Sequence, residues 1–197
     1  MEGKLVRLRR YEPSDLDELM RFVNDEEVTR NLGSLLTLPV SRLAEEGFVE
    51  NVSRGSHNDH EFAIETLGGE YLGGCGLHRI DWIDRNAEVG IVIWKKEYWG
   101  KGYGSDAMMV LLRCAFRKMN LHRVFLRVYE DNERAIRSYE KCGFQREGVL
   151  RETRFIDGRY LNALVMGILA PEFDDGLMAA PGMQSDEQIV RRTIARL

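Results

Sequence analysis

A glycine-rich segment at residues 99–105 joins two stretches of opposite periodicity. Residues 88–94, which precede it, are rich in β-forming residues, whereas apolar residues recur at helical spacing through residues 104–119. A glycine-rich turn that opens a helix leaves the first backbone N–H groups unpaired, uncovered by side chains and at the positive end of the helix dipole. The segment therefore predicts a phosphate-binding cradle where a strand is followed by a helix.

The composition fits one compact domain. The chain has 197 residues, of which 44% are hydrophobic and 30% are charged. Its formal net charge of −4 argues against a generic nucleic-acid binder, which usually carries a basic face. No apolar run approaches the roughly 18 to 20 residues of a membrane-spanning helix, and residues 1–4 lack the apolar core of a signal peptide. We therefore expect a cytoplasmic protein that binds neither nucleic acid nor a membrane.

Cysteine and histidine spacing gives little support for a metal site. Cys75, Cys114 and Cys142 are widely spaced and form no CxxC pair, so neither a disulfide framework nor a thiolate zinc site is indicated. Residues 57–60, His-Asn-Asp-His, have the donor types of a metal clip, but a polar loop before a strand explains them equally well. We expect no bound metal.

The first half of the chain predicts helices followed by a meander. A short strand near residues 5–8 precedes a helix that opens at residues 12–15, and a second helix is expected over residues 41–51. In and just after this second helix, the expected buried positions are Leu43, Phe48 and Val52. Strands at residues 61–65, 71–82 and 88–94 then follow one another through short turns, which indicates an antiparallel meander.

The second half predicts a crossover and a hairpin. The helix at residues 104–119 is followed by a β-rich run at residues 122–129, and this succession implies a parallel strand pair. Asn132 begins another helix, and Gly143 lies just past its end. Asp157-Gly158 is the two-residue turn of a hairpin between residues 149–156 and 160–169.

These elements predict an α/β (α+β) domain over residues 1–172. Beyond it the composition changes, and residues 173–197 are expected to be a tail or a partner-contacting arm.

Three interpretations compete for the glycines themselves. Residues 102–107, Gly-x-Gly-x-x-Ala, match a dinucleotide fingerprint, with Glu130 at a tolerable distance to hold a ribose. However, residues 95–99 separate the preceding strand from the glycines, which does not suit a Rossmann unit. A nucleoside-triphosphatase loop needs a lysine and a hydroxyl residue directly after its last glycine, which residues 105–106 do not supply. A turn that merely requires glycine stays open as the third interpretation.

Three motifs taken together resemble a known family. They are residues 98–105 (Tyr-Trp-Gly-Lys-Gly-Tyr-Gly-Ser), 132–135 (Asn-Glu-Arg-Ala) and 138–144 (Ser-Tyr-Glu-Lys-Cys-Gly-Phe). In order and separation they resemble the acetyl-coenzyme A (acetyl-CoA) signature of the GNAT acyltransferase superfamily, and most of all that of its ribosomal-protein N-terminal acetyltransferases and spermidine N-acetyltransferases. One departure is Trp99, where the superfamily usually has Gln or Arg.

The resemblance implies a single GNAT domain, with a central mixed, mostly antiparallel sheet flanked by helices. It implies acetyl-CoA as the cosubstrate, no metal, and a homodimer as the assembly. Val92, Ile93 and Trp94 would offer an open strand edge to the pantetheine amides of the cofactor. The other residues implied to bind it are Trp99, Gly100, Lys101, Gly102, Tyr103, Gly104, Ser105 and Asn132. Asn132 is equally well explained as a helix N-cap.

Acetyl transfer from a thioester to an amine sets two chemical demands. The amine must be neutral to attack, although its pKa is roughly 10.4 in a lysine-like chain and roughly 7.7 to 8.0 at a protein N-terminus. The departing thiolate, with a thiol pKa of about 8.5 by analogy with cysteine, leaves more readily when an acid protonates it.

Two residues are predicted to meet these demands. Tyr139 matches the family tyrosine that is assigned as the acid, and we predict Glu88 as the base, acting directly or through water. A core tyrosine and a solvent-facing glutamate are the alternatives. A covalent route through Cys142 is disfavoured because no histidine adjoins it in the sequence.

We therefore predict direct transfer of the acetyl group of acetyl-CoA to a primary amine. The acceptor is left open among a polyamine, a peptide or protein N-terminal amine, and another small amine. Acidic residues at 25–27 and 45–46 suit a cationic acceptor, but they also suit the solvated faces of helices. Two alternatives remain, namely a non-catalytic acyl-CoA-binding sensor and an NAD-dependent oxidoreductase.

Overall fold

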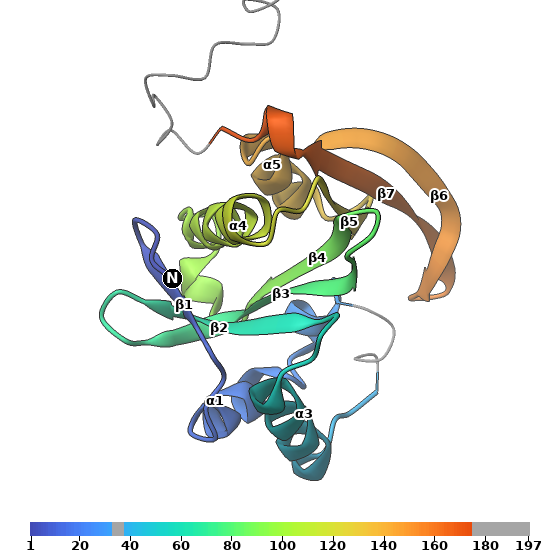
Figure 1. The fold of residues 1–197 in the computed structure, drawn as a ribbon. Helices are drawn as coiled ribbons and strands as arrows, with labels where there is room; N and C mark the ends of the chain where they lie inside the picture. Colours follow the sequence, from blue (N-terminus) through green and yellow to red (C-terminus); the bar gives the residue numbers. More distant parts are fainter. Residues whose placement is uncertain (33–37, 175–197) are drawn as a thin grey trace, which may run out of the picture.

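Seven strands form one sheet that is antiparallel except at one place. In the computed structural model, which describes residues 1–32 and 38–174, the strand order is β1-β2-β3-β4-β5-β7-β6 (Figure 1). The strands are β1 (Val6–Arg9), β2 (His60–Thr66), β3 (Tyr71–Asp81), β4 (Asn86–Ile93), β5 (Arg123–Tyr129), β6 (Gln145–Ile156) and β7 (Arg159–Leu169). β4 and β5 run parallel. The predicted meander, parallel pair and final hairpin are thereby confirmed.

Helices cover both faces of this sheet. They are α1 (Asp15–Phe22), α2 (Glu26–Thr29), α3 (Arg42–Arg54), α4 (Tyr103–Arg113) and α5 (Glu133–Lys141). Figure 1 shows α4 and α5 on one face and α1 and α3 on the other. The larger core lies under α4, where Met108, Leu111 and Leu112 are at most 1% exposed, and a smaller cluster around Leu19 packs under α1. None of the described helices is long and apolar enough to cross a membrane.

β4 and β5 pair over a short distance and then separate. Their parallel ladder runs from Asn86 opposite Arg123 to Glu88 opposite Phe125. β5 continues beside β7 as far as Tyr129, whereas residues 89–93 of β4 pair with β3 alone. The sheet therefore has an opening in its middle, and one edge of β4 faces that opening.

The turns and caps at the end of the chain follow the predictions from sequence. The Asn132 side chain accepts the Ala135 N–H at 3.2 Å and caps α5. Gly143, just beyond α5, has a φ of 93°, which favours glycine. Asp157 and Gly158 both have positive φ, 49° and 78°, as a two-residue hairpin turn requires.

Two long elements differ from the predictions in detail. The helix expected over residues 104–119 is α-helical only as far as Arg113 and continues as a π-helical turn over Cys114–Lys118. Phe173, at the start of the expected tail, packs against Phe116 of this turn, with 5.2 Å between ring centroids. The rest of that tail, residues 175–197, lies outside the described residues.

The buried face of helix α3 differs from the predicted one. Leu43 is 77% exposed and Phe48 is 37% exposed, so the expectation that both are buried was wrong. Val52 is half-buried, and the fully buried positions are Glu45 and Val49. The physical reason is that the face of α3 with Glu45 borders a cavity, which is described below. Glu45 presents its carboxylate to that cavity.

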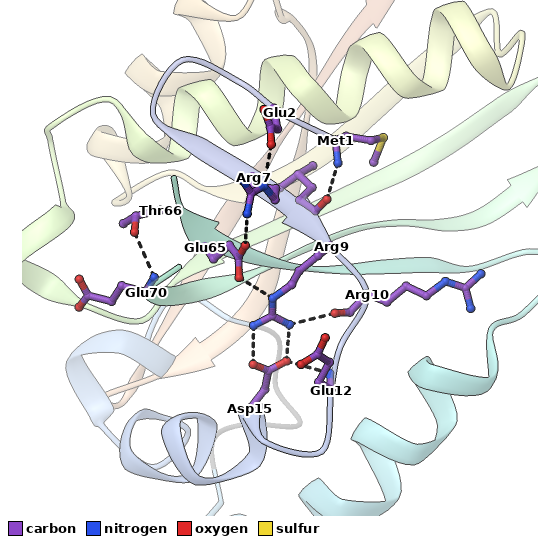
Figure 2. A network of polar contacts seen from close by, with 11 residues as sticks. Met1, Glu2, Arg7, Arg9, Arg10, Glu12, Asp15, Glu65, Thr66 and Glu70 are labelled. Carbon is purple, nitrogen blue, oxygen red and sulfur yellow. Dashed lines mark hydrogen bonds and ion pairs between the residues drawn. The ribbon is translucent and has the colours of Figure 1, made fainter. Parts of the chain in front are cut away.

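An arginine network ties β1 to the start of α1 (Figure 2). Arg9 binds both carboxylate oxygens of Asp15, at 2.7 and 2.6 Å, and its Nε donates to Glu65 at 2.6 Å. Arg7 reaches the same Glu65 carboxylate at 3.1 Å. These contacts, that with Asp15 above all, raise the pKa of Arg9. Because Asp15 and Glu65 are buried, the bidentate pairing holds α1 in a fixed place on the sheet.

Candidate active site

The opening between β4 and β5 is a cleft of about 370 Å³. Its walls come from these two strands, from the glycine-rich turn before α4, and from α5. The predicted site residues that line it are Val92, Ile93, Trp99, Gly100, Gly102, Gly104, Ser105, Asn132 and Tyr139. The structure thus brings together, in one cleft, residues that lie almost 50 positions apart in the sequence.

The glycine segment forms an uncovered helix start. Gly100 and Gly102 have φ values of 72° and 92°, which explains why glycine stands there. The first bond of α4 runs from the Asp106 N–H to the Gly102 carbonyl at 2.9 Å, so the N–H groups before Asp106 have no intrahelical partner. No side chain among the described residues caps this helix. These N–H groups are therefore available to a phosphate, as the sequence predicted.

The open edge of β4 offers the backbone N–H of Ile93 rather than the backbone groups of Trp94. The Trp94 N–H donates to the Leu72 carbonyl of β3 at 2.8 Å, and its indole donates to Tyr71 at 3.1 Å. Backbone groups alternate in direction along a strand, so those of Ile93 face the cleft. The Ile93 carbonyl accepts the Trp99 indole N–H at 2.7 Å. Trp94 itself is 6% exposed and lies on the α1 side of the sheet.

A positively charged side chain packs against the face of the Trp99 ring. The guanidinium of Arg134 lies 3.6 Å from the centroid of Trp99, and burial lowers the pKa of Arg134. Arg134, Arg137 and Lys141 project from α5 into the cleft wall. These cations suit a diphosphate, and they were not among the site residues predicted from the sequence. The spacing of i, i+3 and i+7 along α5 was the available signal, because it places all three on one helix face.

Lys101 and Tyr103 lie beside the cleft, whereas Ser105 lines it. Lys101 is exposed at the tip of the turn. The Tyr103 ring packs edge-on against Tyr98 with 4.8 Å between centroids, and the Tyr98 hydroxyl donates to Glu70 at 2.6 Å. Ser105 Oγ lies 2.8 Å from Ser138 Oγ, and this hydrogen bond links the start of α4 to the middle of α5.

Tyr139 lies half-buried in the wall of the cleft. Its ring packs against Phe144 at 5.8 Å, and burial raises the pKa of Tyr139 to about 12. The phenol is therefore protonated at neutral pH, which is the form that a proton donor must have.

Cys142 is a packing residue in this arrangement. It is 5% exposed, its thiol donates to the Ser105 carbonyl at 3.7 Å, and burial raises its pKa to about 11. A thiol with a raised pKa is a poor nucleophile at neutral pH, so the covalent route has no support.

Glu88 lies where β4 and β5 still pair. Its carboxylate accepts the Arg127 Nε–H at 2.8 Å, and it also forms an ion pair with Arg79. Glu88 is 9% exposed and is not part of the cleft lining, whereas Arg127 is. The carboxylate therefore holds Arg127 at the cleft.

A second cavity, of about 290 Å³, lies on the α1 and α3 side of the sheet. It meets the first cleft at Leu32, Ile91 and Val92, which line both. Apolar residues form most of its wall, and its ionisable residues are Tyr11, Glu45, Glu61, Cys75 and His78. The two cavities thus approach the open part of β4 from opposite faces.

Only part of the predicted acidic wall faces this cavity. Asp25 and Glu27 bind Lys96 at 2.9 and 2.5 Å, and the hydrogen bond from Lys96 lowers the pKa of Asp25. Glu46 is exposed and contacts Arg42 at 3.3 Å. Glu45 lines the cavity and is 8% exposed.

The metal-clip and dinucleotide interpretations both conflict with the structure of the segments involved. His57 packs against Trp82 at 5.5 Å between ring centroids, and Asp59 accepts the Arg79 N–H at 3.0 Å. Residues 57–59 therefore serve a loop before β2, and His60 is the first residue of that strand. The dinucleotide interpretation fails on topology, because an antiparallel meander precedes α4 and the sheet contains a single parallel pair among its described strands.

Comparison with known proteins agrees with this geometry. Residues 6–145 match the family model described as an acetyltransferase (GNAT) domain. A spermidine N(1)-acetyltransferase of Vibrio cholerae is 32% identical over 85% of this chain and 95% of its own length. The Escherichia coli K12 spermidine N(1)-acetyltransferase is also 32% identical, over 85% of this chain and 88% of its own.

A solved structure has the same fold. The crystal structure of the V. cholerae spermidine N-acetyltransferase, in complex with CoA and spermine, superposes with a TM-score of 0.76 at 30% identity. The match covers 85% of this chain and 96% of that one. This chain belongs to the GNAT family of acetyl-CoA-dependent N-acetyltransferases, and it transfers an acetyl group to an amine.

Proposed function

We propose that the acceptor is a small polycationic amine of the polyamine type. One observation carries this proposal: the cleft with the glycine turn meets, at Ile91 and Val92, an apolar cavity that contains Glu45 and Glu61. A buried and a partly buried carboxylate in an apolar cavity suit a ligand that alternates ammonium groups with methylene segments. The names of the relatives, which are spermidine acetyltransferases, point to the same class of acceptor.

The cofactor would lie along the β4 edge in this proposal. The N–H groups of the glycine turn would bind the pyrophosphate, with Arg134, Arg137 and Lys141 supplying positive charge. The pantetheine arm would follow Val92 and Ile93, and Tyr139 would protonate the departing thiolate. The amine would attack the thioester from the α1 side. The role of Glu88 as base stays a prediction from sequence.

The test is a comparison of acceptors by release of free CoA thiol from acetyl-CoA. We expect spermidine and spermine to give kcat/KM values at least 10-fold above those of peptides with a free N-terminus and of single amino acids. Faster acetylation of the peptides would contradict the polyamine assignment. Binding of acetyl-CoA without thiol release for any amine would instead identify a sensor.

We further propose that two copies associate through the β6–β7 hairpin. β6 is an edge strand, and Val149, Leu150, Phe155 and Tyr160 on this hairpin are 39% to 62% exposed. Light scattering should give twice the chain mass, and Phe155→Lys should shift the mass towards that of one chain. A monomeric wild-type protein would contradict this proposal.

A further inference from the structure

Two glycines leave the floor of the second cavity, which is the sheet surface under it, free of side chains at their positions. Gly76 of β3 lies opposite Gly90 of β4 and also opposite Glu61 of β2. A Cβ atom on Gly76 would lie 2.3 Å from the Glu61 carboxylate, and one on Gly90 would lie 3.1 Å from Nε2 of His78. The absence of these two side chains lets Glu61 and His78 lie flat across the sheet, towards β4.

Glu61 and His78 contact each other on this floor. Nδ1 of His78 lies 3.1 Å from the Glu61 carboxylate, and the two side chains are 33% and 19% exposed. A carboxylate at Nδ1 selects the tautomer with the proton on Nδ1 and the lone pair on Nε2. Within the described residues Nε2 has no hydrogen-bond partner, and it lies over Gly90, next to Ile91 where the two cavities meet.

Glu45 faces the same cavity from α3. It is 8% exposed and has no ion-pair or hydrogen-bond partner among the described residues for its carboxylate. Burial alone raises the pKa of Glu45, and burial also raises the pKa of Glu61 despite the opposing effect of His78. An unpaired buried carboxylate destabilises a protein unless a cation joins it, so the cavity is complementary to a bound ammonium group.

We propose that His78, oriented by Glu61, removes the proton from the ammonium group to be acetylated, and that Glu45 binds a second ammonium group of the same acceptor. This assignment rests on the proposed function. Leu19, Val23 and Phe48 line the same cavity and suit the methylene segment of the acceptor.

The proton and electron balance of the step is simple. The acceptor ammonium gives one proton to Nε2 of His78, which forms an imidazolium beside the Glu61 carboxylate. The amine lone pair then forms the C–N bond, and the C–S bond breaks. The phenol of Tyr139 gives its proton to the departing sulfur. The nitrogen loses a second proton as the amide forms, and this proton restores the phenol of Tyr139. The products are the amide, the CoA thiol and one proton, which leaves from His78 to solvent.

Glu88 is less suited to this task than His78. The two residues are opposite each other on β3 and β4, but the Glu88 carboxylate is already paired with Arg127 and Arg79. The Glu88 carboxylate is thus occupied by two guanidinium groups, whereas Nε2 of His78 has no hydrogen-bond partner among the described residues. The ionisable groups that surround His78 are Glu61, Asp59, Glu45, Glu88 and Arg79.

The first experiment compares His78→Gln with Glu88→Gln in the full chain, by kcat for spermidine as a function of pH. We expect the wild-type kcat to rise with pH through one ionisation that depends on His78. His78→Gln should lower kcat at pH 7 by about 100-fold, abolish that ionisation and leave acetyl-CoA affinity unchanged. Its residual activity should rise steadily towards alkaline pH, where free amine becomes available.

Two further variants separate the roles in this pair. Glu61→Gln should lower kcat by about 10-fold and shift the ionisation to lower pH, because the imidazolium loses its carboxylate partner. Glu88→Gln should leave the ionisation where it is in the wild type. The proposal would be overturned if the pH profile of His78→Gln were unchanged and the ionisation were lost in Glu88→Gln. That outcome would not affect the assignment of a polyamine as the acceptor. Wild-type inactivity towards polyamines would instead overturn the proposed function.

The second experiment tests Glu45 with acceptors of equal length. Glu45→Gln should raise KM at least 10-fold for a diamine, leave KM unchanged for the alkyl monoamine of the same length, and raise the Tm of the free protein. Glu46→Gln, one position along the same helix and outside this cavity, is the matched control. Equal changes in KM for both acceptors would show that Glu45 does not bind a second ammonium group.

Discussion

Gly102→Val is expected to weaken acetyl-CoA binding by about 100- to 1,000-fold, or roughly 3 to 4 kcal/mol. Gly102 has a φ of 92° and precedes the uncapped start of α4. A β-branched residue strains this backbone, and its side chain stands beside the N–H groups that face the cleft. Isothermal titration calorimetry with acetyl-CoA measures the effect.

Gly69→Val is the matched control for this variant. Gly69 has a φ of 89° in the turn between β2 and β3, and a Cβ atom there meets nothing within 4 Å. Both variants carry similar backbone strain, so both should unfold at lower temperature. Acetyl-CoA affinity should fall in Gly102→Val alone. Wild-type affinity in a folded Gly102→Val protein would show that the pyrophosphate lies elsewhere.

Tyr139→Phe is expected to lower kcat by about 100-fold or more while acetyl-CoA affinity stays near that of the wild type. The change removes one hydroxyl group from the cleft wall and keeps the ring contact with Phe144. Because burial raises the pKa of Tyr139 to about 12, the phenol stays protonated between pH 7 and 10. Ionisation of Tyr139 should therefore cause no loss of activity in that range.

Tyr98→Phe serves as the control for Tyr139→Phe. Tyr98 lines the same cleft, but its hydroxyl donates to Glu70 on the outer side. Stopped-flow thiol release should show a slow chemical step in Tyr139→Phe and a normal one in Tyr98→Phe. A loss of cofactor binding with an unchanged chemical step would contradict the role of Tyr139 as acid.

Local sequence patterns predicted the elements of the fold because each has its own physical signal. The glycine turn, the Asn132 cap and the Asp157-Gly158 hairpin depend on residues close in sequence, and the structure contains all three. The parallel pair followed from chain connectivity, since a helix separates β4 from β5.

The acceptor side was harder to predict because it depends on pairing between distant strands. Glu61 meets His78 only through the register of β2 on β3, and the glycines that make room for them look like ordinary strand interruptions in the sequence. The period of α3 placed Phe48 in the core. Glu45 and Glu46 were both predicted from the sequence as acidic residues that suit a cationic acceptor, but the sequence did not show that Glu45 alone of the two faces the cavity. Hydrophobic periodicity shows which face is buried, but it does not distinguish a packed core from the wall of a pocket.

Trp99 gives the protein an intrinsic optical probe of its cofactor cleft. Its indole donates to Ile93 and lies under Arg134, whereas Trp94 is buried behind its bond to Tyr71 and Trp82 lies on the far loop beside His57. A ligand that enters the cleft changes the surroundings of one of the three indoles. Fluorescence emission should therefore follow ligand titration without a label, and the signal should vanish in Trp99→Phe.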